Sequence, residues 1–71
     1  MDGLTEVTGK LVNEEIYDKD HTYLILTYEA IFNGVPVRKN FFTDAPTGPG
    51  YKFKPIVTFM VDKDGKAVGP G

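Results

Sequence analysis

The sequence predicts an all-β fold: a small five-stranded antiparallel barrel that forms a single domain over residues 1–71. Two observations support this fold class. Short runs rich in β-branched and aromatic residues alternate between apolar and polar positions, which is the period of a β-strand. Tight turns separate these runs, most clearly at Asn33-Gly34, where an Asn-Gly pair supplies the positive φ angles of a type I′ hairpin. An OB-like barrel, or alternatively an SH3-like meander, would remove the exposed edges of an open sheet.

The first predicted strand covers residues 5–12 and leads into a hairpin. Val7, Gly9 and Leu11 fall on one face of it, and mostly polar residues fall on the other. A glycine inside a strand suits a bulge or a sharp bend, so we expect one at Gly9. The acidic stretch 13–20 is compatible with a short helix. Continuation of the strand into a turn at residues 18–21 gives a long hairpin, which we favour.

Residues 22–32 form the strongest predicted strand. One face is continuously apolar and is the predicted core face; it consists of Leu24, Leu26, Tyr28, Ala30 and Phe32. The opposite face is mixed, as expected of a face that is partly open to water. It consists of Tyr23, Ile25, Thr27, Glu29 and Ile31.

The strand after the Asn-Gly turn is predicted over residues 35–42. Its core face comprises Val35, Val37 and Phe41, which leaves Phe42 outward beside Arg38. A proline at position 36 cannot donate a ladder hydrogen bond, so we expect this strand at an edge of the sheet.

The last third of the chain alternates again after a Pro/Gly-rich loop at residues 44–50. We expect a strand over residues 51–61 that Pro55 bends or divides into two pieces. A turn at 62–65 and a short closing strand at 66–68 complete the five strands.

The residue inventory argues against an enzyme. The chain has no Cys and no Ser, and its one histidine, His21, lies in a predicted turn, where a histidine is ordinarily solvated. The acidic pairs of residues 14–20 fall in the same solvated stretch. The Asp-Lys-Asp-Gly sequence at 62–65 lacks the remaining ligands of a calcium loop and is explained by a hairpin turn. We therefore predict no catalytic residue, no metal site and no cofactor.

The N-terminal residues lack the basic start and apolar run of a signal peptide. No apolar run approaches the ~20 residues that a membrane-spanning helix requires. We expect a cytoplasmic protein with no membrane partner.

Charge is distributed unevenly along the chain. Residues 1–33 carry two lysines against seven acidic residues, whereas residues 34–61 carry four basic residues against one acidic residue. Aromatic residues interleave with these cations, as in grooves that stack the bases of a single strand and contact its phosphates. The candidate nucleic-acid-binding residues are Tyr23, Arg38, Lys39, Phe42, Tyr51, Lys52 and Lys54. Alternatively, the aromatics are core residues and the lysines are their solvated neighbours.

Three features of the second half resemble the single-stranded-DNA-binding (helix-destabilising) proteins of filamentous phages. They are Pro-Val-Arg-Lys-Asn-Phe-Phe-Thr at 36–43, Pro-Gly-Tyr at 49–51 and the Asp-Gly-Lys turn at 64–66. The resemblance covers about residues 35–68 and corresponds to the C-terminal half of that family. It implies a five-stranded OB-like barrel, a homodimer, and cooperative coating of single strands during DNA replication.

Two functional hypotheses follow. The first is sequence-independent binding of single-stranded DNA or RNA, in which the four basic candidates contact phosphates and the three aromatic candidates stack with bases. The second is a protein-interaction module or small inhibitor. It would bind its partner through the acidic turn 14–20 or through an exposed strand edge.

Overall fold

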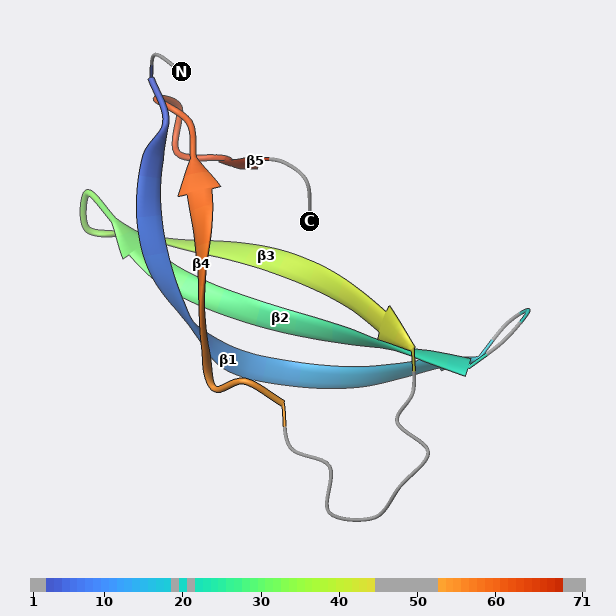
Figure 1. The fold of residues 1–71 in the computed structure, drawn as a ribbon. Helices are drawn as coiled ribbons and strands as arrows, with labels where there is room; N and C mark the ends of the chain where they lie inside the picture. The colour runs from blue at the N-terminus through green and yellow to red at the C-terminus, as the bar shows by residue number, and fades with distance from the viewer. Residues whose placement is uncertain (1–2, 19, 21, 45–52, 69–71) are drawn as a thin grey trace.

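The computed structural model describes residues 3–18, 20, 22–44 and 53–68, and confirms the all-β prediction (Figure 1). The strands are β1 (Thr5–Asp18), β2 (Thr22–Phe32), β3 (Val35–Asp44), β4 (Ile56–Val61) and β5 (Ala67–Val68). They form one antiparallel sheet in the order β3-β2-β1-β4-β5, which curls into a nearly closed barrel. In the described ranges, no helix has the length and apolar character that crossing a bilayer requires.

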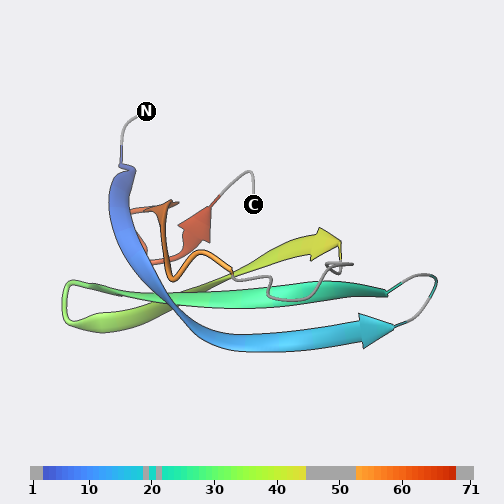
Figure 2. The same cartoon turned by 60° about the horizontal axis from the view of Figure 1, so that its bottom comes forward.

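The topology depends on β1, which pairs with β4 through its first half and with β2 through its second half. Figure 2 shows β1 bending from one partner to the other. Because β4 returns to lie beside β1, the order β4-β1-β2-β3 is a Greek key, as in the OB-like barrel predicted from the sequence.

Two of the three predicted turns fall within the described residues and both are present; the third, at 18–21, includes residues 19 and 21, which lie outside them. Asn33 and Gly34 have φ angles of 52° and 78°, as a type I′ hairpin requires. At the second turn, Oδ1 of Asp62 accepts hydrogen bonds from the backbone N–H groups of Asp64 and Lys66, both at 2.9 Å. Gly65 takes a φ of 84° there, so the Asp-Lys-Asp-Gly sequence forms a side-chain-stabilised turn into β5.

The core lies on the inner face of the curled sheet, and β2 contributes most of it. The buried apolar residues are Leu24, Leu26, Tyr28, Ala30, Val37, Phe59 and Val61. Four of the five residues of the predicted core face of β2 are therefore confirmed as buried, and the fifth, Phe32, is partly buried and packs against the core. The predicted burial of Val35 is wrong, because this residue pairs with Phe32 beside the exposed turn and its side chain is 59% exposed. The edge position predicted for β3 from Pro36 is confirmed.

Gly9 is buried where β1, β2 and β4 meet, but it does not form a bulge. A Cβ at Gly9 would lie 2.6 Å from Cε1 of Phe59 and 3.2 Å from Cβ of Tyr28. The missing side chain therefore lets the Phe59 ring pack against the backbone of β1. The bulge occurs three residues later, where the register with β2 shifts between Leu11 and Asn13. Val12 is the extra residue, and the inward and outward positions of β1 exchange there.

We predict that Gly9→Ala lowers the free energy of unfolding by about 1–3 kcal/mol, because the new methyl group overpacks a core contact that backbone and ring must relieve. Urea denaturation measures this change through the shift of the midpoint at constant slope. Thr8→Ala, at the exposed neighbouring position, is the control and should change stability by about 0.5 kcal/mol or less. Equal losses in the two variants would contradict the packing role of Gly9.

Candidate functional site

The outer face of β1, β2 and β3 carries a mixed set of side chains that are accessible to a ligand. Alternation along β2 turns the residues opposite to the core set toward this face, and the β3 residues beside them turn the same way. The cross-strand pairs between β2 and β3 on this face are Tyr23–Asp44, Ile25–Phe42, Thr27–Asn40, Glu29–Arg38 and Ile31–Pro36.

Three aromatic rings follow one another across one end of this face. Tyr17 of β1 pairs directly with Tyr23 of β2, and their ring centroids are 5.2 Å apart with the planes tilted by 34°. Tyr23 lies 5.8 Å from Phe42 of β3, with a tilt of 39°. Phe42 is 62% exposed and Tyr17 41%, while Tyr23 between them is half-buried. We call these three residues the aromatic row; their mutual contacts hold exposed rings in defined positions.

An open hollow of about 480 Å³ adjoins the aromatic row and is lined by Tyr23, Phe42, Thr43 and Asp44. Because it is open to solvent, it suits a flat group that rests on the rings better than an enclosed small molecule.

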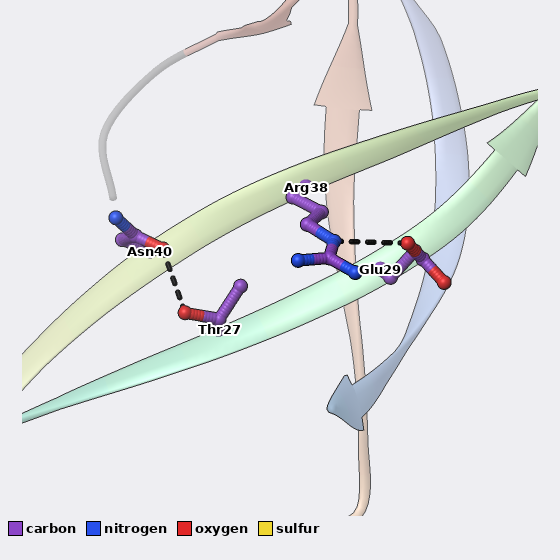
Figure 3. Close-up of polar contacts among 4 residues, drawn as sticks. All are labelled: Thr27, Glu29, Arg38 and Asn40. Atoms are coloured by element: carbon purple, nitrogen blue, oxygen red, sulfur yellow. Dashed lines mark hydrogen bonds and ion pairs between the residues drawn. The ribbon is translucent and has the colours of Figure 1, made fainter. Parts of the chain in front are cut away.

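Polar pairs occupy the middle of the same face (Figure 3). Nε of Arg38 lies 2.9 Å from Oε1 of Glu29, and the side chains are 64% and 28% exposed. The hydroxyl group of Thr27 donates to Oδ1 of Asn40 at 2.8 Å. Both pairs join β2 to β3 directly across the ladder. An ion pair this exposed contributes about 0–1 kcal/mol, and it offsets much of the charge of Arg38.

Lys39 and Lys54 do not lie with Arg38 and Phe42. Lys39 falls on the inner face of β3, where its Nζ lies 5.6 Å from the centroid of the Phe41 ring. Lys54 lines clefts with Phe41 and Val57, also on the inner side. The backbone carbonyl of Lys54 accepts a 2.7 Å hydrogen bond from the hydroxyl of Tyr28.

The separation has a physical cause. Alternation assigns Lys39 to the face opposite Arg38, and β4 pairs with β1 instead of β3, so the segment that precedes β4 does not extend the outer face of β3. Lys54 therefore does not share a face with Arg38 and Phe42, although all three are candidate nucleic-acid-binding residues. The candidates Tyr51 and Lys52 lie outside the described residues.

Acids outnumber bases among the described charges on the outer face, where Lys10 and Arg38 stand against Glu6, Glu15, Glu29 and Asp44. Lys10 pairs with Glu29 across the ladder, so Glu29 lies between Lys10 and Arg38. Two acids, Glu15 and Asp44, lie beside the aromatic row, opposite Ile25 and Tyr23. The excess of basic residues over 34–61 is therefore divided between two faces and does not form one basic surface on the described residues.

Tyr17 is the residue of the aromatic row that the sequence analysis missed. It lies in an acidic stretch whose pattern is irregular. The predicted turn at residues 18–21 would place Tyr17 opposite Thr22, because antiparallel strands pair residues that are equidistant from the turn centre. The observed register is centred on Asp20 and places Tyr17 opposite Tyr23, so the predicted turn did not indicate this pair.

The described residues contain no group of three His, Cys, Asp or Glu side chains that could hold a metal ion. His21 lies outside the described residues. Asp62, in the sequence that superficially resembles a calcium loop, uses Oδ1 for the turn.

Comparison with protein-family models, with curated proteins and with solved structures gave no significant match.

We predict a small, salt-dependent coupling between Glu29 and Arg38. A double-mutant cycle with Glu29→Gln and Arg38→Gln should give about 0.2–1 kcal/mol at low salt and less as salt screens the pair. Urea denaturation of the four proteins measures it. The cycle of Thr27→Ala and Asn40→Ala is the uncharged reference and should not respond to salt. If the coupling between Glu29 and Arg38 responded to salt no more than the coupling between Thr27 and Asn40, the ion pair would be contradicted.

Proposed function

We propose that this chain binds single-stranded nucleic acid, DNA or RNA, without sequence preference, on the outer face of β1, β2 and β3. The observation that carries the proposal is the aromatic row, three rings in succession on an exposed face of a Greek-key barrel. In OB folds, oligonucleotides bind to the face of strands 2 and 3 and to the adjoining loops. The row occupies the corresponding position here.

Stacking supplies the main attraction in this proposal. A base that stacks on an aromatic side chain gains about 1–3 kcal/mol, and every base offers a flat face, so stacking is tolerant of sequence. Phe42 and Tyr17 are the exposed stacking surfaces, and Tyr23 between them holds both rings in place. The adjoining hollow accommodates a base that extends beyond Phe42.

Phosphate contacts supply a smaller part of the binding free energy. Lys10 and Arg38 are the described cations on the outer face, and both flank Glu29. Glu15 and Asp44 beside the row repel phosphates at close range, so a bound strand turns its bases toward the rings and its phosphates toward Lys10, Arg38 and solvent. Two phosphate contacts correspond to a slope of about −1.4 in log K against log salt for a single strand.

We predict that the chain binds labelled oligothymidylate with this shallow salt dependence, and that Phe42→Ala weakens binding about 5- to 100-fold, the equivalent of one lost stacking contact. Fluorescence anisotropy at two salt concentrations measures both quantities. Ile31→Ala is the matched control, because Ile31 is an apolar residue of the same face of β2, 65% exposed and distant from the row. It should bind as the unchanged chain does.

Three results would reject the proposal. They are no binding at low salt, equal affinity of Phe42→Ala and the unchanged chain, and a larger loss in Arg38→Ala than in Phe42→Ala. The last result would mean that charge and not stacking carries the affinity. Unfolding curves of each variant confirm that the fold is retained.

A further inference from the structure

Among the described strands, the second half of β1 has a partner on one side only. Residues 5–10 of β1 pair with β4, and the N–H of Leu11 donates to the carbonyl of Pro55 at 2.9 Å. From Asn13 to Asp18, β1 pairs with β2 on one side, and no other described strand pairs with it. In Figure 1 this edge is the lower border of the β1–β2 hairpin. We call residues 13–18 the β1 edge.

The β1 edge differs from the edge of β3. Pro36 removes a backbone donor from β3, one of the devices by which proteins protect a sheet edge. The β1 edge contains no proline, and its Ile16 is 70% exposed. Its inward-facing Glu14 is itself a protective device, one that opposes an acidic or apolar strand but not a basic one. An extended strand that no other described strand covers on this side is a template for the addition of such a basic strand.

The side chains of the β1 edge specify the charge of a partner. Glu14 lies opposite Leu26 and shares the inner face with Ile16, whereas Glu15 lies opposite Ile25 on the outer face. Among the described residues, neither glutamate makes an ion pair. A partner strand therefore meets one acid on each face, at consecutive positions, followed by an apolar residue.

We infer that the β1 edge binds an extended segment of another protein by strand addition, and that this segment carries two adjacent Lys or Arg residues beside an apolar residue. Consecutive side chains of a strand point to opposite faces, so each basic residue reaches one glutamate. The apolar residue covers Ile16, and the backbone ladder provides the remaining contacts.

The test uses a labelled peptide of about eight residues in which two adjacent arginines stand between β-branched residues. We expect it to bind, with an affinity that falls as salt rises, since the glutamates are exposed. Two peptide controls define the mode. Exchange of both arginines for glutamates should abolish binding, and methylation of alternate backbone nitrogens on the ladder side should do the same while leaving the charge unchanged.

Matched variants of the chain locate the site. Ile16→Lys adds a repulsive charge to the edge and should weaken binding roughly tenfold or more, whereas Ile31→Lys changes an equally exposed isoleucine of β2 and should not. Equal binding of the methylated peptide would show a charge attraction without strand addition and overturn the inference. Equal effects of both variants would also overturn it. The inference would also be overturned if the chain did not bind the peptide and instead formed dimers that Ile16→Lys dissociates.

Discussion

The close approach of Phe59 to Gly9 is the contact on which the arrangement of the strands depends. β1 leaves β4 and joins β2 near this point, and both the Phe59 ring and Cβ of Tyr28 lie close to Gly9. Tyr28, Phe59 and Val61 belong to one buried cluster, so the distance between β1 and β4 decides whether that cluster is closed. Because the chain has no cysteine, its stability depends on apolar burial. The fold therefore requires β1 and β4 to lie at this distance from each other.

The Greek key divides the molecule into a barrel body and an arm. The body contains the crossing of β1, β2 and β4 and most of the buried residues. The arm is the far half of the β1–β2 hairpin with the end of β3, and the molecule extends 39 Å along its longest axis. Phe42 and Ile16 lie on the arm and are largely exposed, because the core does not require their burial. Stability and the two proposed binding functions therefore depend on different residues.

Local signals predicted most of the fold, and non-local pairing limited the prediction of the site. Asn33-Gly34 determined one hairpin and the alternation of residues 22–32 determined the core face, because both depend on neighbours in sequence. That β4 pairs with β1 depends on residues some fifty positions apart, for which no local pattern exists. Phe42 was predicted outward, since its position depends only on alternation along β3. Lys54 could not be placed in this way, since its position depends on the crossover.

The bulge at Val12 determines which chemistry each face of the arm presents. Before it, Val7, Gly9 and Leu11 face inward; after it, the even positions Glu14 and Ile16 do. An arm of the same sequence with an uninterrupted register would turn Tyr17 toward the inside and Ile16 toward the outer face, because a shift of one residue exchanges the two sides of a strand. The extra residue thus places Tyr17 instead of Ile16 on the outer face, so this face of the arm is aromatic and not aliphatic.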